Sequence, residues 1–124
     1  MHRAFMLSAL LLAAAPAQAQ NVRYLHPITA ALQFEDFRTT RAALKLGAVE
    51  ANPVMRWCAP RTPCLATVKS FTALSIIAAG EQLRAQGHKR GAFWLTVLLN
   101  SVQLVVNVNN YSTLHTLRTR HTGR

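Results

Sequence analysis

Acidic residues are scarce in this 124-residue chain, which has four Asp and Glu against 14 Lys and Arg and carries a net charge of +10. Charged residues make up only 15% of the sequence, well below the roughly 25% typical of soluble domains. The charge imbalance predicts anionic partners, either lipid head groups or nucleic acid. A small nucleic-acid binder would interleave its basic residues with aromatics on a polar surface. Here the longest apolar stretch carries no charge, so we expect a lipid bilayer as partner and no nucleic acid.

Cysteine and histidine are too few and too scattered to predict a metal centre. The two cysteines, Cys58 and Cys64, do not form a Cys-x-x-Cys motif, and the five histidines contain no pair at metal-ligand spacing. No Ser or Cys has an evident His neighbour that could act as its base. We therefore expect no metal and no cofactor, and favour a role without catalysis.

The N-terminus has the pattern of a signal peptide over residues 1–19. Arg3 precedes an apolar core over residues 5–15, and Ala17-Gln18-Ala19 supplies a small-x-small cleavage site. The core is shorter than the roughly 20 residues that a membrane span needs. This favours cleavage after Ala19 over an uncleaved anchor, and it predicts the bacterial inner membrane as destination, reached through the export pathway.

The remaining chain predicts an all-α fold: a three-helix membrane domain over residues 30–112, after a polar lead-in at 20–29. An amphipathic helix is expected over 30–47, an apolar helix over 62–80 with a single charge, and an uncharged stretch over 91–117. Residues 113–124 form a basic tail.

Polar residues recur along one face of the last predicted helix, at spacings of four, three, four and three. They are Thr96, Asn100, Gln103, Asn107 and Asn110. Lipid offers no hydrogen bonds, so such side chains must find partners within the protein. The stripe either binds something or holds helices together; we favour the second interpretation.

One ion pair is expected inside the bundle. Asp36 shares a helix face with Thr39, Thr40 and Ala43, and Lys69 lies early in the second predicted helix. If these two helices pack together, Asp36 and Lys69 are natural partners. An ionisable residue at membrane depth suggests function, although Asp36 at the membrane surface would simply face water.

The order of these motifs resembles a family of small bacterial membrane proteins with a domain of unknown function. The resemblance covers about residues 30–112 and rests on Asp36-x-x-Thr39-Thr40, on residues 47–55 (Gly-Ala-Val-Glu-Ala-Asn-Pro-Val-Met) and on Lys69. It implies a three-helix membrane core and no activity. Arg38 and Arg41 make the first helix more charged than an ordinary span, and the signal peptide lies outside the family core.

Two functional hypotheses follow. The first is a structural or interaction protein that packs with itself or in a larger membrane complex, with its basic tail on anionic lipid head groups. The alternative is an intramembrane polar site for ion-linked transport or catalysis around Asp36 and Lys69. The candidate residues of that site are Asp36, Thr40, Glu50, Asn52, Lys69, Asn100, Gln103 and Asn107. A soluble, exported, basic binding protein is disfavoured by the long uncharged run.

Membrane orientation follows from the charges flanking the helices. A cleaved signal and three spans would place the loop over residues 48–63 and the basic tail in the cytoplasm, which agrees weakly with the positive-inside rule. A two-helix hairpin, with residues 30–47 on the surface, fits that rule worse. The three-span arrangement predicts that Cys58 and Cys64 remain free thiols, because the cytoplasm is reducing.

Overall fold

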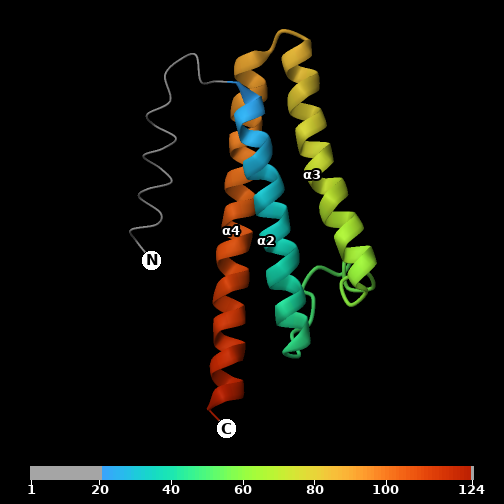
Figure 1. The fold of residues 1–124 in the computed structure, drawn as a ribbon, viewed down its shortest axis with the longest axis vertical. Helices are drawn as coiled ribbons and strands as arrows, with labels where there is room; N and C mark the ends of the chain where they lie inside the picture. Colours follow the sequence, from blue (N-terminus) through green and yellow to red (C-terminus); the bar gives the residue numbers. More distant parts are fainter. Residues whose placement is uncertain (1–20, 124) are drawn as a thin grey trace.

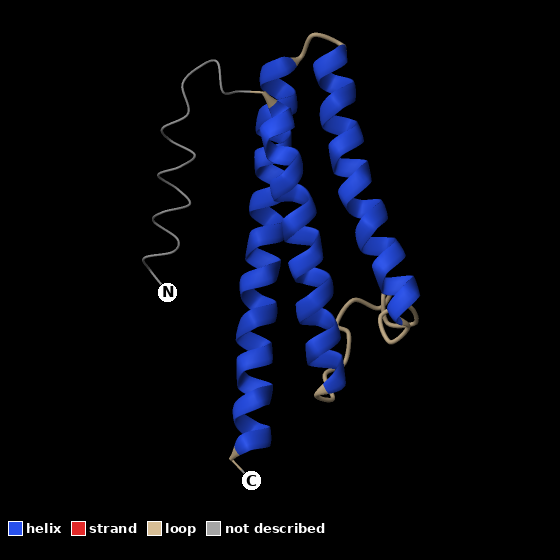
Figure 2. Cartoon of the chain, in the orientation of Figure 1, coloured by secondary structure: helices blue, strands red, loops and turns tan. Residues whose placement is uncertain are grey.

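The computed structural model describes residues 21–123, which form three long helices after a short 3-10 helix, η2, at Val22–Leu25. Helix α2 spans His26–Lys45, α3 spans Thr62–Ala85 and α4 spans Lys89–Thr122. The described residues contain no strand (Figure 2), which confirms the all-α prediction. The expected signal peptide lies outside these residues.

The helices run up and down beside one another, and each contacts the other two (Figure 1). Pro27 and Pro63 lie in the first turns of α2 and α3, where the missing N–H breaks no helical hydrogen bond. Gly47 and Gly87, both at φ +87°, follow the ends of α2 and α3. This left-handed conformation suits glycine and lets the chain leave each helix in a tight turn.

The helix bounds differ from the predicted ones mainly at their outer ends. Helix α2 begins at His26, inside the expected lead-in, and α4 continues to Thr122, so most of the expected basic tail is helical. Its 34 residues correspond to roughly 50 Å at 1.5 Å per residue, and the helix extends past the ends of α2 and α3 (Figure 1). Helices α3 and α4 are long and apolar enough to cross a membrane.

Gly80 allows the closest approach between α3 and its neighbours. A Cβ placed there would lie 2.9 Å from Cγ2 of Val22 and 3.0 Å from Oγ1 of Thr96. Val22 and Thr96 are themselves fully buried. Gly80 is therefore the point at which η2, α3 and α4 meet.

We expect Gly80→Ala to lower the stability of the bundle by about 1–3 kcal/mol, because the added methyl group overpacks this contact. Gly91→Ala is the matched control, since its new Cβ would meet only Cβ of His88 at 3.9 Å. Thermal unfolding of both variants in detergent checks this, and equal midpoints would contradict the close packing at Gly80.

The loop between α2 and α3 contains a disulfide between Cys58 and Cys64, whose Cα atoms lie 5.4 Å apart. The expectation of free thiols is therefore wrong. The turns that follow Pro53 bring Cys58 back against the first turn of α3, within the range that a disulfide requires.

Candidate functional site

Asp36 is the centre of a polar cluster enclosed by all three helices. Its side chain is 3% exposed and pairs with the Lys69 ammonium. Gln103 Nε2 donates to Oδ2 at 2.8 Å, and Asn110 Nδ2 donates to Oδ1 at 2.8 Å. Thr40 Oγ1 donates to Oδ1 at 3.2 Å. The carboxylate thus accepts four hydrogen bonds, and its charge is offset by one ammonium group. The expected Asp36–Lys69 pair is confirmed.

Asp36 lies in a row of polar contacts because polar side chains repeat at helical spacing on both α2 and α4. Gln33 and Asp36 are three residues apart on α2, and Gln103 on α4 bridges them. Gln33 Nε2 donates to Gln103 Oε1 at 3.0 Å, and Gln103 donates in turn to Asp36. Residues three or four apart share a helix face, so each polar side chain meets the next one along the seam.

Two further contacts between α2 and α4 belong to this seam. Thr29 Oγ1 donates to Asn100 Oδ1 at 2.9 Å, and Asn107 Nδ2 donates to the Leu32 carbonyl oxygen at 2.9 Å. Thr96, Asn100 and Asn107 are buried. The α4 stripe therefore faces α2 and the inside of the bundle, as expected for a stripe that holds helices together.

The structure brings together some of the expected site residues but not all of them. Thr40, Lys69 and Gln103 touch Asp36 directly, whereas Asn100 and Asn107 bind other groups on α2. Glu50 and Asn52 lie in the loop after α2. Asn52 is exposed and stabilises its own turn, accepting from the Val54 backbone N–H at 3.0 Å; it does not join the Asp36 cluster.

Sequence reasoning missed Gln33 and left Asn110 out of the candidate site. The signal was present for both residues. Asn110 continues the four–three spacing of the α4 stripe by one more step. Gln33 lies three residues before Asp36, so it shares that residue's helix face. Each is a direct member of the hydrogen-bonded seam.

Outside the seam, Glu35 and Arg38 form a second link between α2 and α4. Arg38 Nη2 binds Glu35 Oε2 at 2.8 Å, and both side chains bind the hydroxyl of Tyr111. Arg41 lies over the Phe37 ring at 5.6 Å. The two arginines that make this helix more charged than an ordinary span are therefore both engaged locally.

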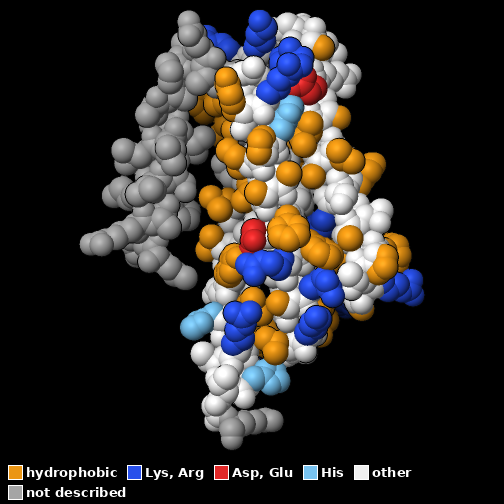
Figure 3. All heavy atoms as spheres, in the orientation of Figure 1, with side chains coloured by type: hydrophobic (Ala, Val, Ile, Leu, Met, Phe, Trp, Pro, Cys, Tyr) orange, Lys and Arg blue, Asp and Glu red, His pale blue; other side chains and the backbone are white. Residues whose placement is uncertain are grey.

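The distribution of polarity is unlike that of a typical soluble protein. Within residues 21–123, seven polar or charged residues are buried beside nine apolar ones, and 15 large hydrophobic residues are exposed. Phe71 and Leu74 on α3 and Leu98 on α4 are at least 60% exposed. On the face in Figure 3, apolar side chains cover the middle of the bundle, and most Lys and Arg side chains gather toward its two ends.

Residues 27–116 match the model of a protein family described as Domain of unknown function (DUF5658). The chain belongs to this family. The match confirms the expected resemblance to a family with a domain of unknown function, and it covers a few more residues at each end. The motif pattern on which that resemblance rested stays a prediction. No curated protein and no solved structure matches the chain. Membership of the DUF5658 family thus does not assign an activity, and the function has to be argued from the geometry of this chain.

Proposed function

We propose that this DUF5658-family chain is a small integral membrane protein with a structural or interaction role, in the bacterial inner membrane after entry through the export pathway. The observation that carries the proposal is the distribution of side chains: many polar side chains are buried between the helices, and large apolar side chains are exposed on the outside. In water, exposed apolar surface of this extent is unfavourable. In lipid, the exposed apolar side chains face acyl chains, and the buried polar ones find partners inside the protein.

Helix α2 fits this proposal despite its charges. It lacks the composition of a stand-alone span, yet Thr29, Gln33 and Asp36 are buried against the other helices. Its length of 20 residues corresponds to about 30 Å, the thickness of a bilayer core. Packed beside α3 and α4, it crosses the same layer with its polar face shielded.

An interaction role is supported by the outer surface of α3. Only Leu65 and Gly80 are buried among its 24 residues. Its exposed side chains, including Phe71 and Leu74, are available to lipid and to other membrane helices, whether from a second copy or from a larger complex. The basic ends would meet anionic lipid head groups.

We expect the protein to stay in the pellet when membranes are washed with alkaline carbonate, which strips peripheral proteins. Release into the supernatant would contradict an integral protein. A photoreactive residue at position 71 tests the interaction role in intact membranes: a discrete protein adduct supports it, and labelling of lipid alone would contradict it. Position 101 on α4 serves as the comparison site.

The alternative, a transport or catalytic site at Asp36, is less well supported by the same geometry. Four donors already surround the carboxylate, from Lys69, Gln103, Asn110 and Thr40. Proton or ion transfer would require Asp36 to release these partners. A buried carboxylate whose hydrogen bonds are all made instead rigidifies the structure around it.

A further inference from the structure

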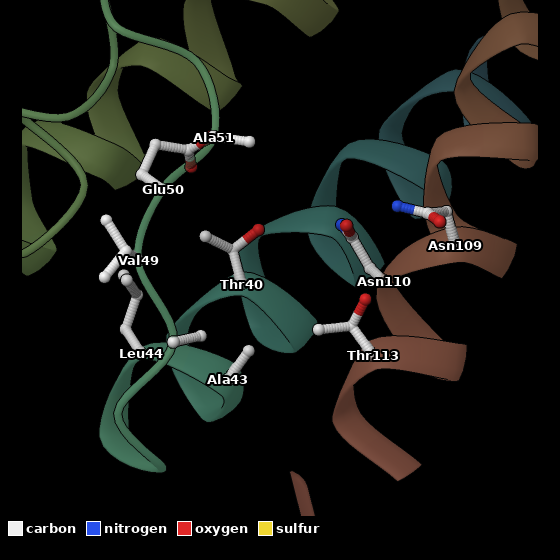
Figure 4. Close-up of a pocket in the computed structure, with 10 residues that line it drawn as sticks. Thr40, Ala43, Leu44, Val49, Glu50, Ala51, Asn109, Asn110 and Thr113 are labelled. Atoms are coloured by element: carbon white, nitrogen blue, oxygen red, sulfur yellow. The ribbon is translucent and has the colours of Figure 1, made fainter. Parts of the chain in front are cut away.

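A hollow of about 150 Å³ lies at the end of the bundle where α2, the loop after it and α4 meet (Figure 4). Thr40 and Leu44 contribute from α2, Glu50 from the loop, and Asn110 and Thr113 from α4. Two of these residues, Thr40 and Asn110, also bind Asp36. The hollow therefore borders the polar cluster without being part of it.

Glu50 is the one carboxylate of this chain that has no ion pair within residues 21–123. Glu35 pairs with Arg38, Asp36 with Lys69, and Glu81 with Arg84 and Arg23. Glu50 instead accepts a hydrogen bond from the Asn52 backbone N–H at 3.0 Å. In a chain of net charge +10, an acid left without a cation at the wall of a hollow suggests a cationic ligand.

For two other polar residues of the wall, Thr40 and Asn110, the bonds to Asp36 fix the orientation of the side chain. Thr40 uses its hydroxyl hydrogen, and Asn110 its amide nitrogen, on Oδ1 of Asp36. Because an ionised carboxylate only accepts hydrogen bonds, this assigns the orientation of both groups. The atoms of Thr40 and Asn110 that remain free to bind a ligand in the hollow are acceptor oxygens. The site therefore suits a ligand that is rich in N–H donors.

One basic residue, Arg56, lies at the rim of the hollow, which argues against a bare cation as the ligand. Arg56 Nε donates to the Glu50 carbonyl oxygen at 3.3 Å, so its guanidinium group lies beside the hollow with further N–H donors available. Such a group binds phosphate well. A ligand with an ammonium group and a phosphate satisfies both the acceptor wall and the basic rim.

The position of the hollow points to lipid as the source of that ligand. The uncharged apolar part of α4 covers residues 92–108, and Asn109 and Asn110, which line the hollow, come directly after it. The exposed Trp57 lies in the adjoining loop and is a residue type enriched at the membrane–water interface. The hollow is thus level with head groups.

We propose that this hollow binds the head group of a phosphatidylethanolamine-type lipid. The primary ammonium lies among the oxygens of Glu50, Thr40 and Asn110, and the phosphate binds the Arg56 guanidinium. A primary ammonium has three N–H donors, whereas a trimethylated choline head group has none. The assignment goes beyond the proposed membrane role, which holds whether or not the hollow selects a lipid.

The test is a binding titration of the full chain in detergent, followed by Trp fluorescence, with short-chain phosphatidylethanolamine, phosphatidylcholine and phosphatidylglycerol. We expect the ethanolamine lipid to bind at least tenfold more tightly than the other two, and Glu50→Gln to abolish that preference. Glu35→Gln, which alters an ion-paired carboxylate on α2, should leave that preference unchanged. Equal binding of ethanolamine and choline lipids, or full selectivity in Glu50→Gln, would overturn the proposal.

Two further binding measurements test the phosphate contact and the need for acyl chains. Arg56→Gln changes an exposed loop side chain and should weaken binding of the ethanolamine lipid severalfold at an unchanged unfolding midpoint; undiminished binding would contradict the phosphate contact. Glycerophosphoethanolamine, which has the head group without acyl chains, should bind at least tenfold more weakly than the lipid. Equal affinity would identify a soluble ligand and overturn the lipid assignment.

Discussion

Replacing Asp36 by Asn is expected to reduce the abundance of the protein in membranes more than any other single polar substitution in the bundle. The variant leaves the Lys69 ammonium without its counter-charge and turns an amide N–H toward donors on Gln103 or Asn110. Removing one partner of a buried ion pair costs about 3–5 kcal/mol. That is a large share of the roughly 5–15 kcal/mol by which a typical folded domain is stable.

The second substitution Lys69→Met should partly restore the abundance of Asp36→Asn, because it removes the unpaired charge. Glu35→Gln is the matched control: its carboxylate is adjacent in sequence but its partner Arg38 is exposed, and exposed pairs contribute about 0–1 kcal/mol. Quantitative immunoblots of membrane fractions, arranged as a double-mutant cycle, measure the coupling. Additive defects would show that Asp36 and Lys69 act independently, against the structure.

The triple substitution of Asn100, Gln103 and Asn107 by Leu should separate α2 from α4 while leaving insertion intact or improved. It removes four interhelical bonds, two of them at Gln103, and each bond is worth about 1 kcal/mol or less in membranes. It also leaves the Gln33 amide nitrogen without its partner and removes one donor from the Asp36 carboxylate. Each buried group left unsatisfied costs about 1–3 kcal/mol more.

Unfolding by sodium dodecyl sulfate, followed through Trp fluorescence, checks this expectation. The midpoint should fall for the triple variant and stay unchanged for Ser101→Leu, because Ser101 is exposed and bonds only to the Val97 carbonyl of its own helix. A triple variant as resistant as the wild type would mean that the stripe does not hold the bundle together.

Much of the bundle could be predicted because a bilayer constrains sequence tightly. Polar side chains in a span need protein partners, so the four–three spacing from Asn100 to Asn110 predicted a buried face. The same argument predicted the Asp36–Lys69 pair from two isolated charges on neighbouring helices. Both follow from the chemistry of lipid alone, without knowledge of how the helices cross.

Other features depend on facts that the sequence does not contain. The Cys58–Cys64 bridge requires a loop that folds back on α3, and the spacing of the two cysteines alone does not show that fold-back. Glu50 was expected to join Asp36 in one polar site. The loop instead places Glu50 at a separate hollow. The chain turns at Gly47, so Glu50 no longer lies on the helix face that carries Asp36.

The most direct measurement of the central claim, polar inside and apolar outside, is the access of a lipid-soluble label to single cysteines along α4, in a background with Cys58 and Cys64 replaced by Ser. We predict weak labelling at Asn100, Gln103 and Asn107, and strong labelling at the exposed Leu98, Val102 and Val105. Equal labelling of the two sets, or strong labelling of the polar set, would contradict the structure described for this bundle.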